Sequence, residues 1–122
     1  MKNKNLVFRE AKTKDIYYIH EILYISFRPY QRFYTNHAYA STVLSPKEIK
    51  NRILKEKYDV YISIFNDKFV GTASISIKNQ DILYIRSMAV HPDFQRQGIG
   101  AYILDNIVKI AVKKGIKKIV LE

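Results

Sequence analysis

Three residues in the last third of the chain have the types and the spacing of an anion site. Gln95, Gly98 and Gly100 form the pattern Q-x-x-G-x-G between an apolar run that predicts a strand and an amphipathic stretch that predicts a helix. The first N–H groups of a helix lack intrahelical partners, and the helix dipole adds partial positive charge there. Glycine has no side chain, so an anion can approach these donors closely. The pattern therefore predicts a site for a group the size of pyrophosphate.

The wider stretch around these residues resembles a known signature. V-H-P-D-F-Q-R-Q-G-I-G, residues 90–100, is similar to the acetyl-coenzyme-A-binding signature of the GNAT N-acetyltransferases, in which [RQ]-x-x-G-x-[GA] cradles the coenzyme pyrophosphate. The apolar strand before it, the amphipathic helix after it and the final Val120-Leu121-Glu122 also match. The resemblance implies a GNAT-type N-acetyltransferase that uses acetyl-CoA as its cosubstrate and needs no metal.

The resemblance also implies roles for residues on both sides of the glycines. Backbone groups of Met88, Ala89 and Val90 are expected to contact the pantetheine arm of the coenzyme. The residues expected to hold the pyrophosphate are Gln95, Arg96, Gln97, Gly98, Ile99, Gly100 and Ala101. Arg96 either adds positive charge to this site or points into solvent.

The reaction implied by the resemblance is a direct attack of an amine on the acetyl thioester. It needs a base for the ammonium proton and a group that protonates or stabilises the leaving thiolate. Many relatives carry a carboxylate on the central strand, but here it reads Tyr84-Ile85-Arg86-Ser87-Met88, and arginine is no base at neutral pH.

Two candidates for the catalytic groups remain. Glu122 lies in a V-L-E context similar to the strand end of the ribosomal-protein N-terminal acetyltransferases, whose glutamate there is assigned as the base. Tyr84 is the second candidate, and it needs a strongly lowered pKa for this role. The alternatives are a solvated or disordered Glu122 and a packing role for Tyr84.

Hydrophobic periodicity predicts the elements that position these residues. Strands are expected at 6–9, 60–65, 69–77, 82–90 and 116–121. A helix is expected over 16–27 with Thr13 or Asp15 as its cap, and another runs from the glycines to a C-terminal Gly115. Ser45-Pro46-Lys47-Glu48 predicts a capping box at the start of a further helix.

The order of these elements predicts an α/β (α+β) fold, a GNAT-like mixed sheet with helices on both faces. It runs strand, two helices, three antiparallel strands, helix, and a strand parallel to 82–90. Residues 28–44 are rich in aromatic side chains and predict a loop without regular structure. This loop either shapes the acceptor site, as the resemblance implies, or covers the core.

Length and composition limit the classes of protein that fit. With 122 residues, the chain is expected to form a single domain, 1–122. The absence of cysteine excludes disulfides and thiolate catalysis. No apolar run approaches the ~20 residues of a membrane span, and no apolar segment follows the charged start, so a cytoplasmic location without a membrane partner is expected. The net charge of +10 raises nucleic acid as a partner, but dispersed lysines favour a solvated surface.

The expected elements stop earlier than is usual in the family. GNAT domains usually continue with another helix and two more strands, so a domain lacking its C-terminal part is expected. Two hypotheses follow: an N-acetyltransferase for an amine (a protein N-terminus, a lysine or a small amine), or a truncated acetyl-CoA-binding module with little or no turnover. The open sheet edge at 116–121 further predicts a homodimer through this strand.

Overall fold

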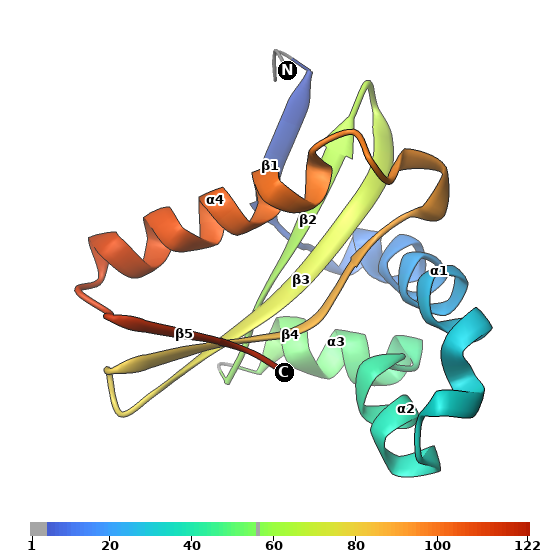
Figure 1. Ribbon diagram of the computed structural model, residues 1–122, viewed down its shortest axis with the longest axis horizontal. Coiled ribbons are helices and arrows are strands. Elements are labelled where there is room, and N and C mark those ends of the chain that lie inside the picture. Colours follow the sequence, from blue (N-terminus) through green and yellow to red (C-terminus); the bar gives the residue numbers. More distant parts are fainter. Residues whose placement is uncertain (1–4, 56) are drawn as a thin grey trace.

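The computed structural model describes residues 5–55 and 57–122. Its centre is a five-stranded sheet in the order β1-β2-β3-β4-β5, as Figure 1 shows. The strands are β1 (Leu6–Glu10), β2 (Asp59–Phe65), β3 (Lys68–Lys78), β4 (Ile82–Val90) and β5 (Lys118–Leu121). Neighbouring strands are antiparallel from β1 to β4, whereas β4 and β5 are parallel. The helices are α1 (Ile16–Phe27), α2 (Asn36–Thr42), α3 (Pro46–Leu54) and α4 (Ile99–Lys113). The predicted fold class is confirmed.

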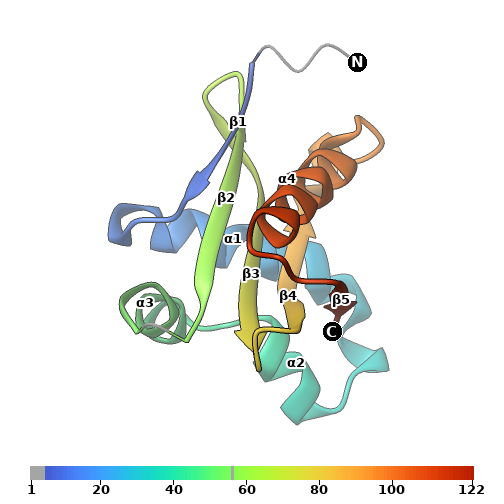
Figure 2. The same ribbon diagram turned by 90° about the vertical axis from the view of Figure 1, so that its left-hand side faces the viewer.

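Helices cover both faces of the sheet and divide the core in two (Figure 2). On one face the stripe of Ile99, Ile103 and Ile107 from α4 packs on β3 and β4. On the other face α1 packs on β3 and β4, and α3 packs on β2, through a second cluster that contains Ile22 and Ile49. Each isoleucine removed from water contributes about 1.5–3 kcal/mol to folding, so the two layers fix α4 and α1 against the same strands. Within the described residues, no helix is long and apolar enough to cross a bilayer.

The start of α3 has the geometry that its sequence predicts. The Ser45 Oγ accepts a hydrogen bond from the Glu48 N–H at 3.2 Å, and Glu48 Oε1 accepts one from the Ser45 N–H at 3.0 Å. This reciprocal capping box satisfies two N–H groups that the helix leaves unpaired.

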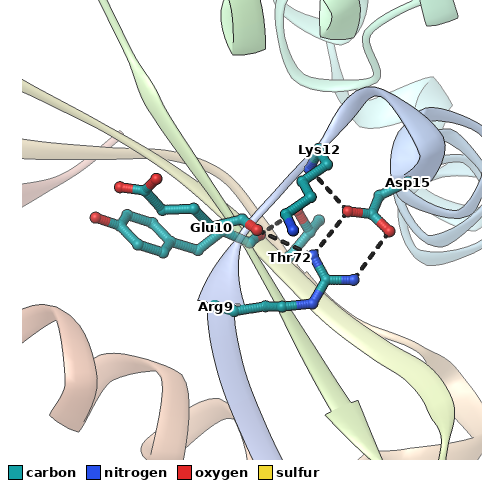
Figure 3. A network of polar contacts seen from close by, with 6 residues as sticks. Arg9, Glu10, Lys12, Asp15 and Thr72 are labelled. Atoms are coloured by element: carbon teal, nitrogen blue, oxygen red, sulfur yellow. Dashed lines mark hydrogen bonds and ion pairs between the residues drawn. The ribbon is translucent and has the colours of Figure 1, made fainter.

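The predicted cap of α1 is wrong, because Asp15 has another partner. Thr13–Asp15 form a short 3₁₀ turn, and the carboxylate accepts two hydrogen bonds from the Arg9 guanidinium, at 2.9 and 3.1 Å. It also accepts the Lys12 N–H at 2.7 Å (Figure 3). The carboxylate therefore joins the end of β1 to the start of α1, and makes no side-chain cap for α1.

The predicted loop at 28–44 is helical. A 3₁₀ helix, Arg28–Phe33, follows α1 with Pro29 in its first turn, and α2 follows it. The Thr35 Oγ1 caps α2 by accepting the Ala38 N–H at 3.0 Å. Helical periodicity gave no signal here because neither helix contains a buried residue. The result is an added helix in the predicted order of elements.

Candidate functional site

An extra residue in β4 redirects this strand in the middle of the sheet. Thr72 of β3 faces Ala89, whereas Ser74 faces Arg86, so β4 carries one residue more than β3 between these pairs. Ser87 lies at this bulge with a φ of +49°, a conformation that non-glycine residues rarely adopt. Its Oγ donates a hydrogen bond to the Thr42 carbonyl of α2 at 2.9 Å, which holds the strained residue in place.

The bulge changes the side of the sheet on which the following side chains lie. Leu83 and Ile85 belong to the core under α4, but Ala89 belongs to the core under α1 and α3. On the other edge of β4, pairing with β5 runs from Ile82 to Ile85, and the Glu122 N–H donates to the Ile85 carbonyl at 2.9 Å. Past this point the two strands have no further pairing within the described residues.

A cavity of about 550 Å³ lies beside Met88, Ala89 and Val90, the part of β4 that follows its paired residues Ile82–Ile85. Its walls come from α1, the 3₁₀ helix after it, β4, the glycine turn and the end of β5. Most of the predicted coenzyme residues line it, namely Met88, Ala89, Val90, Gln95, Arg96, Gly98, Ile99 and Gly100. Gln97 and Ala101 are exposed and lie outside this lining. Segments far apart in the sequence thus enclose one space at the start of α4.

Gly98 and Gly100 lack a side chain for different structural reasons. Gly98 precedes α4 with a φ of +81°, which side-chain-bearing residues rarely adopt. A Cβ at Gly100 would meet only Val90 Cγ2 within 4 Å, at 3.8 Å, so the protein's own packing does not require glycine there. Its missing side chain instead leaves open the space beside the first N–H groups of α4. These positions fit a phosphate group well.

The Val90 carbonyl ties three elements of the site together. It accepts hydrogen bonds from the Ser26 Oγ of α1 and from the Gln95 Nε2 of the glycine turn, both at 3.2 Å. These contacts fix the turn and α1 against the end of β4. The Gln95 side chain therefore positions the turn at the cavity wall.

The structure places the two predicted catalytic residues differently. Glu122 lies beside the cavity, because Leu121 lines it and Glu122 lines an adjacent smaller hollow. Its carboxylate accepts hydrogen bonds from Arg86 Nε at 2.9 Å and Nη2 at 3.0 Å, so it is held at the strand end. Tyr84 lies opposite Val120, with Lys78 Nζ 5.2 Å from the centre of its ring. It lines neither space.

The comparison with protein families shows to which family this chain belongs. Residues 16–122 match the family model described as "Acetyltransferase (GNAT) family". The chain belongs to the GNAT acetyltransferase family.

Solved structures share the fold of this GNAT chain at low sequence identity. PaiA N-acetyltransferase from Thermoplasma acidophilum, in complex with coenzyme A, is 18% identical with a TM-score of 0.77, covering 91% of this chain and 74% of that one. The ribosomal-protein-S18-alanine N-acetyltransferase from Escherichia coli is 20% identical with a TM-score of 0.73, covering 95% and 65%. A GNAT family acetyltransferase from Elizabethkingia anophelis with acetyl-CoA bound is 20% identical with a TM-score of 0.67, covering 97% and 65%. The chain thus spans about two thirds of the length of the last two.

The GNAT site also contains residues that the sequence did not single out. An aromatic wall of Phe27, Tyr30, Tyr34 and Phe94 lines the cavity together with Ser26. The aromatic composition of 28–44 was the available signal: Tyr30 and Tyr34 line the cavity and belong to neither core cluster. Ser26 and Phe94 gave no signal, because their place depends on how α1 and the glycine turn pack on β4.

Proposed function

We propose that this chain binds acetyl-CoA in the 550 Å³ cavity and transfers the acetyl group to an amine. Membership of the GNAT family gives acetyl transfer as the general reaction. The observation that supports the coenzyme site is that one cavity joins the unpaired edge of β4 to the glycine-opened start of α4. The PaiA and E. anophelis structures, which share this fold, contain CoA and acetyl-CoA respectively.

The walls of the cavity suit the two chemically different parts of the coenzyme. The N–H groups at the start of α4 and the positive end of the helix dipole favour the pyrophosphate. Among the main-chain groups of Met88–Val90, the Val90 carbonyl already accepts hydrogen bonds from Ser26 and Gln95. The other groups that face away from β3 are proposed to bind the amides of the pantetheine arm, in the manner of an added strand. The aromatic wall excludes water from around this arm. For Gln97 and Ala101, which lie outside the cavity lining, we propose no side-chain contact with the coenzyme.

The bound thioester supplies the acetyl group. Once the ammonium has lost one proton, the amine nitrogen bonds to the carbonyl carbon and the C–S bond breaks. The nitrogen then loses a second proton, which balances the proton taken up by the leaving thiolate. We assign Glu122 as the acceptor of the ammonium proton, because β5 places its carboxylate beside the cavity. Tyr84 has no comparable position and is assigned a packing role.

Isothermal titration calorimetry with CoA tests the coenzyme site. Gly98→Val places a branched side chain at the turn and is expected to weaken binding at least tenfold, about 1.4 kcal/mol. Gly115→Val is the matched control, since Gly115 has a similar φ of +73° and an added Cβ there meets nothing within 4 Å. Equal CoA affinity in folded Gly98→Val and wild-type protein would overturn the assignment.

A coenzyme-binding module with little turnover is the second candidate. It is favoured by the observation that, of the two predicted catalytic side chains, only Glu122 lies beside the cavity. Release of free thiol from acetyl-CoA in the presence of peptide, lysine and small-amine acceptors separates the two. Turnover that disappears in Gly98→Val supports the acetyltransferase, whereas CoA binding without thiol release supports the module.

We further propose that the 122-residue chain forms a homodimer through β5. This strand lies at one edge of the sheet, and its Ile119 and Leu121 are 37% and 65% exposed. Light scattering is expected to give twice the chain mass for wild type and a single mass for Ile119→Lys. Val7→Lys places the same charge on the opposite edge strand, β1, and is expected to leave the dimer intact. A monomeric wild type contradicts the proposal.

A further inference from the structure

A second hollow of about 200 Å³ adjoins the large cavity across the ends of β4 and β5. Residues of α2, Arg86 and Ser87 of β4, and Glu122 line it. The next residue of β4 after Ser87 is Met88, and the residue before Glu122 is Leu121; both line the large cavity. The two spaces are therefore lined by consecutive residues at the ends of the same two strands.

The wall of this hollow carries a guanidinium–carboxylate pair that is open to solvent. Arg86 donates to both oxygens of Glu122, and the two side chains are 33% and 38% exposed. An exposed pair of this kind contributes little to stability, because water solvates both charges when they separate. Each partner is thus available to a ligand that brings the opposite charge.

A second guanidinium lies behind the first. Arg52 of α3 stacks on the Tyr58 ring, 4.3 Å from its centre, and its Nη1 lies 3.4 Å from the Ser87 Oγ. Burial lowers the pKa of Arg52, and the nearby charge of Arg86 also lowers it, whereas Tyr58 and Glu48 act in the opposite direction. Among the described residues that line the hollow, Glu122 is the one carboxylate. The positive charges of Arg52 and Arg86 lie on the same side of the hollow, and together they favour the binding of an anionic group.

We propose that this hollow binds the acceptor as a zwitterion, with the acceptor's carboxylate on Arg86 and its ammonium on Glu122. The inference rests on the proposed acetyl transfer and names the acceptor class as amines that carry a carboxylate. The ligand's two charges exchange with the Arg86–Glu122 pair, so no charge loses its partner. A phosphate monoester lacks the ammonium that Glu122 needs, and its charge is repelled by that carboxylate.

The size of the hollow limits what it holds. At about 30 Å³ for each water in the liquid, 200 Å³ corresponds to a small cluster of heavy atoms. This matches the head group of an amino acid and not an extended side chain. The carboxylate has two sources, the α-carboxylate of a free amino acid or the side chain of an acidic N-terminal residue.

Amide chemical shifts of the ¹⁵N-labelled chain in the presence of saturating CoA test the inference. Alanine carries both charges through its α-carboxylate, and aspartic acid α-amide carries both through its side chain. Alaninamide keeps only the ammonium, and propionate keeps only the carboxylate. At least one zwitterion is expected to shift the amides of Thr42, Ser87 and Glu122 with a Kd at least tenfold below that of alaninamide and propionate. The better of the two zwitterions identifies the source of the carboxylate.

Two arginine variants separate the hollow from the general charge of the surface. Arg52→Gln is expected to reduce the preference for the zwitterion at least threefold. Arg32→Gln removes the same charge from an arginine that also stacks on an aromatic ring, that of Phe33 at 4.8 Å, and is expected to leave the preference unchanged. Equal binding of all four ligands, shifts confined to other residues, no shifts at all, or equal effects of the two variants each overturn the inference.

CoA affinity, measured on the same samples, keeps the two proposals apart. CoA binding without a preference for zwitterions refutes this inference and leaves the proposed function standing. Absence of CoA binding refutes the proposed function. In that case the amide shifts caused by the four ligands in CoA-free protein still show whether the hollow prefers zwitterions.

Discussion

Two arginine–carboxylate pairs among the described residues have nearly the same geometry, but their carboxylates lie in different environments. Arg9 contacts both oxygens of Asp15 at 2.9 and 3.1 Å, and Arg86 contacts both oxygens of Glu122 at 2.9 and 3.0 Å. The two arginine side chains are similarly exposed, at 29% for Arg9 and 33% for Arg86, but the Asp15 side chain is 1% exposed and the Glu122 side chain is 38% exposed. Asp15 also accepts the Lys12 N–H (Figure 3). The buried pair fixes the fold, whereas the exposed pair leaves both charges accessible beside a cavity.

Breaking each pair at its arginine gives the largest expected difference. Arg9→Met leaves the Asp15 carboxylate buried without its cation and is expected to lower the free energy of unfolding by about 3 kcal/mol. Arg86→Met leaves Glu122 in solvent and is expected to cost less than about 1 kcal/mol. Urea unfolding followed by circular dichroism measures both. Similar losses for the two variants contradict the distinction between the pairs.

The dependence of stability on acidic pH is a second test of the comparison, because it reports on the buried Asp15 carboxylate. Burial by itself raises the pKa of Asp15, but the hydrogen bonds from Arg9 and the Lys12 N–H outweigh it, so the pKa lies below its ordinary 3.8. The unfolded chain therefore binds the proton more readily, and the stabilisation is complete above pH 3.8 and is lost as the pH falls through the folded pKa. Asp15→Asn is expected to flatten the fall of stability below this pH. The melting temperature measured as a function of pH tests this, and curves for variant and wild type that run parallel below pH 3.8 rule it out.

Salt gives the smallest expected effect and acts on the other pair. The Debye length falls to about 3 Å at 1 M salt, so exposed charges are screened and buried ones much less. The stability difference between wild type and Arg86→Met is expected to shrink towards zero in 1 M NaCl. The loss in Arg9→Met is expected to persist. A loss that vanishes for both variants shows that neither pair is shielded from solvent.

Features encoded by neighbouring residues were predictable from the sequence. Ser45 and Glu48 form their capping box, β4 begins and ends where its apolar run does, and α4 follows directly after Gly98. Each depends on residues a few positions apart, so its signal is local. The other predicted strands also lie within two residues of their expected bounds.

Features that depend on packing between distant segments were not predictable. The helix at 36–42 buries no side chain, so no periodicity marks it, and Asp15 pairs with Arg9 instead of capping a helix. The contact between Arg86 and Glu122 joins residues 36 positions apart. Its formation depends on the parallel pairing of β4 with β5, which the sequence predicted without the side-chain geometry.

The central claim is that coenzyme A lies between the open edge of β4 and the start of α4, and a crystal structure grown with acetyl-CoA tests it most directly. The account predicts pyrophosphate oxygens within hydrogen-bond distance of the N–H groups at 99–101, and the pantetheine arm alongside Met88–Val90. Coenzyme bound elsewhere on the chain, or absent from crystals grown at millimolar acetyl-CoA with this cavity open to solvent, contradicts it.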